Sequence, residues 1–222
     1  MFAEPETRVF ERASPLHLCG MATATHYDPD MSVLAARTRY FVDNSFGDDG
    51  GYNDRWVTLA KLGPLKLGFP NTAGRIRAVR RHDLHHLVTG YDTDFIGEAE
   101  IAAWELGSGC ENFRAAWVLN HLALPVGMLR APARMARAFA RGCNSKNLYA
   151  EEFNDALLQE RLGSLRERLG VIPAAKASLT ATQQRRFRRT VALGFAGGLL
   201  MIAVLVGLLA LAVLGAIWLF GG

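Results

Sequence analysis

The segment at 81–86, Arg-His-Asp-Leu-His-His, holds the densest group of metal-binding side chain types in the sequence. On a helix, residues three, four and seven positions apart share a face. Counted from Val79, that face holds His82, Asp83 and His86. Burying two imidazoles and a carboxylate without partners is costly, so something must satisfy them, and a metal ion does so directly.

A second helix is expected to supply another ligand. Gly90 suits a helix C-cap and Asp94 an N-cap, which predicts a short connection between antiparallel helices. His86 and Glu98 each lie four residues from that turn, so both are expected about 6 Å from it. The resulting set of two histidines and two carboxylates suits zinc, or iron or manganese. Glu105, seven residues after Glu98, is predicted either to hold a histidine from behind or to be a capping or ion-paired glutamate.

The pattern His-Asp-x-x-His, eleven residues, then Glu closely resembles the signature of the ubiquinone (coenzyme Q) biosynthesis protein Coq-four family. The flanking Thr-Gly-Tyr at 89–91 and Gly-Glu-Ala at 97–99 strengthen the resemblance. The ending at 165–171 is also similar to the way such domains finish. Residues 75–125 carry most of the resemblance, and it becomes looser from there to residue 171.

This resemblance implies a helical fold with a divalent metal, usually zinc, at His82, Asp83, His86 and Glu98. It also implies a role on the membrane in making ubiquinone. The expected partners are a membrane, a prenylated quinone precursor and other quinone-biosynthesis proteins. The four ligands would be the catalytic residues if the metal promotes removal of the ring C1 carboxyl. The alternative is a non-catalytic scaffold or lipid-presenting module with a structural metal.

Two features depart from the family pattern. His85 is expected off the inward face of its helix, and family members usually associate with membranes peripherally, whereas this chain has an apolar C-terminal segment. The histidines are open to two other interpretations. The histidine box of a membrane desaturase or hydroxylase needs several such boxes and several spans, and this chain has six histidines and one apolar segment. A helix with satisfied core histidines is the other interpretation.

The remaining pattern is mostly helical. The acid- and glycine-rich segment 48–54 does not have the spacing of an EF-hand loop and is expected to be a solvated turn. Residues 56–69 are expected to form a short hairpin or an irregular apolar arm. Leucines 158, 162, 165 and 169 have helical spacing that favours core packing over a dimer surface. Helices are predicted near 31–42, 72–89, 95–107, 111–122, 124–142 and 148–169, which gives an all-α compact domain of about five to seven helices with one C-terminal transmembrane helix.

Four arginines in the helix predicted near 124–142 are spaced by four, three and four residues, which places them on one stripe. Such a basic amphipathic surface is predicted to bind anionic headgroups or an isoprenoid diphosphate. The alternative is a solvated helix face. The four residues are Arg130, Arg134, Arg137 and Arg141.

The C-terminal segment is predicted to be a membrane anchor. Thirty residues, 191–220, carry no charge, and about 20 apolar residues span a bilayer core. Arginines at 185, 186, 188 and 189 precede the segment, which predicts a single-pass protein whose domain lies on the cytoplasmic face of the inner (plasma) membrane. Gly194 and Gly198 form one small-xxx-small pair that weakly favours helix association, and hence a homo-oligomer.

Composition bounds the remaining possibilities. The net charge of +4 is modest, and no arginine cluster alternates with aromatics on a recognisable nucleic-acid-binding fold, so nucleic acid is not an expected partner. Three separated cysteines, Cys19, Cys110 and Cys143, are expected to be reduced thiols. The predicted division is an N-terminal extension over 1–30, the metal-binding domain over 31–172, a linker and basic juxtamembrane segment over 173–189, and the anchor over 190–220.

Overall fold

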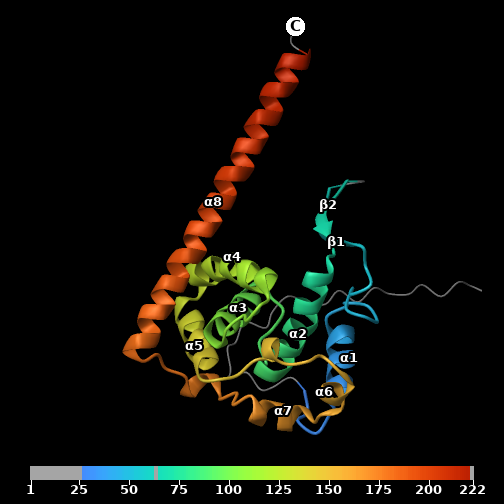
Figure 1. Ribbon diagram of the computed structural model, residues 1–222, viewed down its shortest axis with the longest axis vertical. Coiled ribbons are helices and arrows are strands. Elements are labelled where there is room, and N and C mark those ends of the chain that lie inside the picture. The colour runs from blue at the N-terminus through green and yellow to red at the C-terminus, as the bar shows by residue number, and fades with distance from the viewer. Residues whose placement is uncertain (1–26, 63–64, 221–222) are drawn as a thin grey trace, which may run out of the picture.

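The protein is a helical domain from which one long helix projects (Figure 1). The computed structural model describes residues 27–62 and 65–220. Most of the extension predicted over 1–30, including Cys19, lies outside the described residues. The all-α class is confirmed, with one two-stranded hairpin added. In chain order the elements are α1 (Val33–Asp43), β1 (Trp56–Leu62), β2 (Leu65–Pro70), α2 (Ala73–Thr89), α3 (Phe95–Ser108), α4 (Arg114–Arg130), α5 (Pro132–Cys143), the 3-10 turn η1 (Leu148–Ala150), α6 (Asp155–Gln159), α7 (Leu162–Arg168), the 3-10 turn η2 (Ala174–Lys176) and α8 (Ala181–Phe220).

The helices α2 and α3 have the boundaries that their capping residues predict. Thr72 caps α2 by accepting a hydrogen bond from the Arg75 N–H, and α2 ends at Gly90 in the left-handed conformation with φ of 72°. Asp94 caps α3 by accepting from two backbone N–H groups. Gly97 is required in the first turn of α3, because a Cβ there would lie 2.1 Å from the Asp92 carbonyl oxygen. The connection can therefore be short enough to bring the two helices side by side.

The single helix predicted over 124–142 is wrong, because the chain breaks at Ala131. Ala131 has φ of −149° and ψ of 59°, and Pro132 begins α5 at a position where its missing N–H costs nothing. Pro125, the second residue of the predicted range, lies inside α4.

The helix predicted over 148–169 is also wrong. Glu160 and Arg161 are extended, because tertiary hydrogen bonds replace helical ones there. The Val33 N–H donates to the Glu160 carbonyl oxygen at 2.9 Å, and the Leu162 N–H donates to that of Met31 at 2.9 Å. The leucine stripe is nevertheless in the core, as predicted: leucines 158, 162, 165 and 169 are all buried.

Two apolar clusters make the core. One surrounds α3, whose Trp104 is fully buried against Phe139 of α5 and Leu124 of α4. The other joins α1, the inner side of α2 and the leucines of α6 and α7. The C-terminal half of α2 lies between the clusters, which is why its polar side chains are buried along with its apolar ones.

The helix α8 belongs partly to the domain. Its first turns replace much of the linker predicted over 173–189, since the helix begins at Ala181. Phe187 is buried against the Phe139 ring at 5.1 Å, and Arg186 Nη2 donates to the Leu106 carbonyl oxygen at 2.9 Å. Farther along, an 18-residue window with mean hydropathy of 2.8 is 0 % buried, so α8 is long and apolar enough to cross a membrane and is not a core helix.

The close approach of α8 to α4 occurs at Gly194. A Cβ there would lie 2.7 Å from the His121 carbonyl oxygen and 3.2 Å from Pro125 Cδ. Gly198, one turn later, has nothing within 4 Å of such a Cβ. Gly194 therefore serves packing within this chain, and association between copies stays a prediction.

The hairpin and the loop before it follow α1. β1 and β2 are antiparallel, with Trp56 opposite Pro70 and a register shift between Thr58 and Ala60, so the hairpin alternative of the sequence analysis is the correct one. Asp49 accepts from the N–H groups of Gly51 and Asn53 and thereby shapes the preceding loop. In the part of the chain that the structure describes, this loop does not form a metal-binding group of side chains.

Candidate metal site

The structure brings His82 and His86 of α2 and Glu98 of α3 together. One ligand atom from each lies within 4.8 Å of the others. His82 Nε2 is 3.3 Å from Glu98 Oε2 and 3.2 Å from His86 Nε2, and His86 Nε2 is 3.5 Å from Glu98 Oε1. Ligands about 2.0–2.1 Å from a tetrahedral zinc ion are about 3.3 Å apart. The two imidazole nitrogens are therefore spaced as such an ion requires, and each faces one oxygen of the Glu98 carboxylate at a similar distance.

Both imidazoles are oriented with Nε2 toward this point. The other nitrogen of His86, Nδ1, lies 3.0 Å from the Tyr91 carbonyl oxygen, and that of His82 lies 2.9 Å from Glu105 Oε1. Since a carbonyl and a carboxylate only accept, Nδ1 carries a proton in each ring, and Nε2 is the nitrogen that can bind a cation when the ring is neutral. The ring of Tyr40 stacks on that of His86 with centroids 5.7 Å apart, which fixes the plane of the imidazole.

Glu105 is the hub of the polar network behind the site. It is fully buried and lies 2.9 Å from His82 Nδ1 and 2.7 Å from His85 Nδ1. Its second oxygen accepts from Asn120 Nδ2 at 2.6 Å and from the Tyr149 hydroxyl at 2.7 Å. Four donors around one carboxylate satisfy a buried charge that would otherwise be prohibitive. Glu105 contacts His82 and His85 as an ion-paired carboxylate, so both predicted roles fit its position, and its orienting of a metal ligand stays a prediction.

His85 was predicted to lie off the inward face of its helix, and this prediction is wrong. It is fully buried between Trp104 and Tyr149. Its Nδ1 donates to Glu105, and its Nε2 accepts from the Leu148 N–H at 3.0 Å. Because both ring nitrogens are occupied in the neutral form, His85 is a structural link between α2, α3 and η1 and has no lone pair left for a metal.

The electrostatics of the network separate the two candidate histidine ligands. Burial lowers the pKa of His82, but the carboxylates of Glu105 and Glu98 outweigh burial and hold it well above its usual value. Burial, helped by the neighbouring His82, lowers the pKa of His86 to about 4. The two glutamates respond in the opposite sense: burial raises the pKa of each, yet the adjacent imidazoles keep it below the usual value, most strongly for Glu105. The site therefore favours positive charge at the point where Nε2 of His82 lies.

Asp83 is beside the three-residue group rather than within it. Its Oδ2 accepts a hydrogen bond of 2.5 Å from the Tyr52 hydroxyl, which comes from the loop before β1. Burial raises the pKa of the Asp83 carboxyl to about 6, against the lowering effect of His82. Asp83 lines the same cavity as His82 and Glu98, but it is not part of the group whose ligand atoms lie together. Its role as a metal ligand stays a prediction.

Two cavities of different character meet at the site. The larger, about 1060 Å³, is bordered by the loop and hairpin and reaches His82, Asp83 and Glu98. The smaller, about 160 Å³, runs between α2 and α4 and is walled mainly by small and apolar side chains. Arg75, Val79, His82 and Glu98 line both. A molecule with a polar head and an apolar chain would find both environments on either side of the candidate ligands.

Several residues of the site carry no local signal in the sequence. Tyr52, Asn120 and Tyr149 reach it from distant segments, so their roles depend on tertiary structure. Arg75 was missed although it has a signal, since it lies seven residues before His82 on the same helix face. It is half-buried, with Nη1 donating to Asn71 at 2.9 Å, and among the described residues that line the two cavities it is the arginine or lysine common to both.

The arginine stripe does not form as predicted. The break at Ala131 puts Arg130 on α4, whereas the other three lie on α5. Arg134 binds Glu100 through two hydrogen bonds of 2.9 and 2.6 Å, and Arg141 is buried with Nη1 2.7 Å from the Thr89 carbonyl oxygen. Two of the four guanidinium groups thus hold the domain together. Headgroup binding by the exposed Arg130 and Arg137 stays a prediction.

The donor set fits a divalent metal with room for a further ligand. Two neutral imidazole nitrogens and one carboxylate are a set used by catalytic zinc sites, in which substrate or water takes the remaining position. Glu98 is 42 % exposed at its side chain, on the side of the open cavity. No protein-family model matches the chain, and neither a curated protein nor a solved structure is significantly similar to it.

Proposed function

We propose that this protein is a membrane-anchored, Coq-four-like protein of ubiquinone or related quinone-lipid metabolism. It binds a divalent metal, with zinc the first candidate, at His82, His86 and Glu98, with Asp83 as the fourth residue of the motif. Its substrate is a prenylated ring precursor, and its reaction is loss of the ring C1 carboxyl as CO2, with a proton taking its place on C1. The observation that carries this proposal is that two of the three candidate ligands, His82 and Glu98, line both a polar and an apolar cavity, with His86 close behind them.

The side chains around that point have complementary tasks. A bound divalent ion would act as a Lewis acid toward an oxygen substituent of the ring. Glu105 holds a proton on Nδ1 of His82, and the Tyr91 carbonyl does the same for His86, so that Nε2 is the metal-binding nitrogen of each ring once the ring is neutral. Arg75 offers a positive charge to the carboxylate of the precursor. The walls contributed by α4 exclude water from the apolar part of the substrate.

In the second candidate function the metal is structural. It would join α2 to α3, and the cavities would present a prenylated intermediate to other quinone-biosynthesis enzymes. The polar network already links these helices through His82, His85 and Glu105 without an ion. This redundancy, together with the half-exposed Glu98, favours the catalytic role.

The substitution Glu98→Ala separates the two functions. In the catalytic case the variant loses turnover and keeps its melting temperature, because Glu98 is at the open edge of the site. In the structural case the melting temperature falls steeply. Glu167→Ala, at an exposed position of α7, is the matched control that should change neither quantity.

Lipid profiling tests the pathway itself. A deletion strain complemented with the wild-type chain should make normal quinones, and the same strain with Glu98→Ala should accumulate a carboxylated precursor. Unchanged quinones in the deletion strain would end the assignment to this pathway.

The membrane role follows from α8. We propose that it spans the membrane once, with the domain on the cytoplasmic face of the inner (plasma) membrane. Exposed arginines at 185, 188 and 189 precede the span, which is the usual arrangement on the cytoplasmic side.

A further inference from the structure

The helix α4 presents an uncovered apolar face. Val118, Leu122, Val126 and Leu129 recur every three or four residues, so they lie on one side of the helix. Val118, Val126 and Leu129 are 47 %, 44 % and 75 % exposed, and Trp117 and Leu119 beside them are about half exposed. A contiguous apolar patch of this kind marks an interaction surface rather than ordinary solvent-facing structure.

This face is continuous with the apolar part of α8. The two helices touch at Gly194, next to His121 and Pro125, shortly after the uncharged run begins at Val191. Thirty residues of helix are about 45 Å long, whereas a bilayer core is about 30 Å thick. The surplus of about 15 Å, roughly ten residues, corresponds to the stretch of α8 that passes α4. That length places α4 at the level of the membrane surface.

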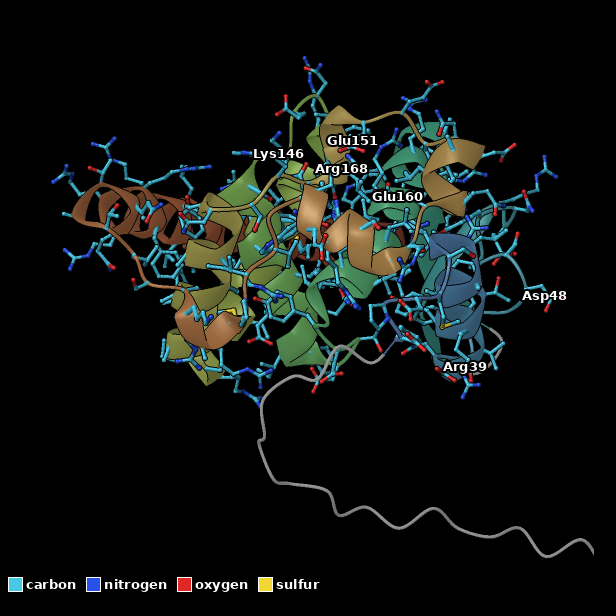
Figure 2. The ribbon with its side chains drawn as sticks, turned by 90° about the horizontal axis from the view of Figure 1, so that it is seen from below. Arg39, Asp48, Lys146, Glu151, Glu160 and Arg168 are labelled. Carbon is cyan, nitrogen blue, oxygen red and sulfur yellow. The ribbon has the colours of Figure 1, made fainter. Side chains whose placement is uncertain are left out.

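The two sides of the domain also differ in polarity. Figure 1 shows α4 and the β1–β2 hairpin on the side of the domain toward which α8 extends. Figure 2 views the opposite side, where Lys146 lies and where Arg168 binds both Glu151 and Glu160. The apolar patch and the charged side are thus on opposite faces, as expected for a domain that rests on a lipid surface.

We propose that α4 is an interfacial helix whose apolar face, Val118, Leu122, Val126 and Leu129, docks on the same bilayer that α8 spans. Arg114 and Arg130, exposed at its two ends, reach the headgroups. Leu119, Ala115 and Ala123 of α4 also line the small apolar cavity at the metal site. Docking therefore places one wall of that cavity against lipid, so that an apolar substrate chain enters from the bilayer without crossing water. The inference rests on the proposal that α8 spans a membrane, and its test separates the two.

Site-directed spin labelling of the full chain in phospholipid vesicles measures this docking. Single cysteines replace Val126, Leu129, Leu205 or Lys146 in a chain whose own cysteines are replaced by alanine, and collision rates with oxygen and with a water-soluble nickel chelate are compared. Leu205 is an exposed residue within the proposed span, and Lys146 is an exposed residue on the charged side. Labels at Val126, Leu129 and Leu205 should collide more with oxygen, and the label at Lys146 more with nickel.

Each other outcome counts against the docking. If Leu205 is in lipid while Val126 and Leu129 collide mainly with nickel, the anchor stands and α4 faces water. If Leu205 also faces water, the anchor and the docking both fail. If the α4 labels are shielded from both reagents, another protein surface covers them. Should the cysteine replacements prevent folding, Leu129→Trp in the otherwise unchanged chain adds a tryptophan to the same face, and quenching by brominated lipid no greater than in wild type overturns the proposal.

Discussion

At the scale of single residues, Glu105 holds the candidate metal site from behind. The substitution Glu105→Gln keeps its shape but replaces one acceptor oxygen by an N–H₂ group that faces donors. Losing a buried charge with four hydrogen bonds should lower the free energy of unfolding by about 2–3 kcal/mol. Zinc affinity should fall by about 10–100-fold, the usual effect of losing a residue that orients a ligand.

Chemical denaturation and a zinc competition titration measure the two effects. Glu167→Gln on the surface of α7 is the control. An unchanged zinc affinity in Glu105→Gln would mean that Glu105 serves only the core. His85→Asn, which removes another partner of Glu105 but no candidate ligand, should affect stability more than zinc affinity.

The proton on His82 predicts how metal binding depends on pH. In the metal-free protein the pKa of His82 is lowered by burial and raised more strongly by Glu105 and Glu98, so it stands well above its usual value. Below that pKa, Nε2 must release a proton before it binds a cation, and affinity should fall by about tenfold for each unit of pH decrease. The pKa of His86, near 4, means that this ring is already neutral and contributes no further proton at neutral pH. Competition titrations between about pH 6 and 8, corrected for protonation of the chelator, measure the slope, and a flat profile would contradict it.

At the scale of helices and strands, the sequence predicted best what is decided locally. The α2–α3 pair was predictable because Gly90 and Asp94 cap the helices through their own backbone neighbours, and its two-helix geometry then brought Glu98 level with His86. The break at Glu160 was not predictable, because its cause is hydrogen bonding to residues 31–33, far away in the sequence. The burial of His85 was not predicted either, because the residues that enclose it also come from distant parts of the sequence. A period of 3.6 identifies one face, whereas the end of α2 is enclosed on all sides.

The crossing of α4 and α8 gives a prediction at this scale. Gly194→Leu would push a side chain into the His121 carbonyl and Pro125, so the helices must separate or bend. Overpacking of this kind costs about 1–3 kcal/mol. Gly198→Leu adds the same side chain one turn later, where the space is open, and is the matched control. The melting temperature of the full chain in detergent should fall for Gly194→Leu alone, and an equal change in both variants would show that the contact contributes nothing to stability.

At the scale of the whole molecule, the boundary between domain and anchor within α8 lies at a different place in the structure than the charges of the sequence suggest. Charge suggested that the domain ends before the arginines and that the anchor begins after them. In the structure, Phe187 is part of the core and Arg186 donates to α3, so the first turns of α8 belong to the domain. If α8 spans a membrane as proposed, a continuous helix that also belongs to the core fixes the height of the candidate metal site above the bilayer, which a flexible linker would not do.

Two truncated chains test this division. A chain that ends at Gly198 retains Phe187 and the contact at Gly194, so its melting temperature should stay close to that of the full chain in the same detergent. A chain that ends at Thr180 loses Phe187 from its place on Phe139, and burial of one phenylalanine contributes about 3–5 kcal/mol. Since each kcal/mol shifts the melting temperature of a chain this long by about 2–4 °C, a fall of roughly 10 °C is expected. Phe187→Ala in the longer chain should reproduce most of that fall. If the shorter chain melts with the longer one, residues 181–189 are a linker after all, and the site is tethered to the membrane rather than held at a fixed height.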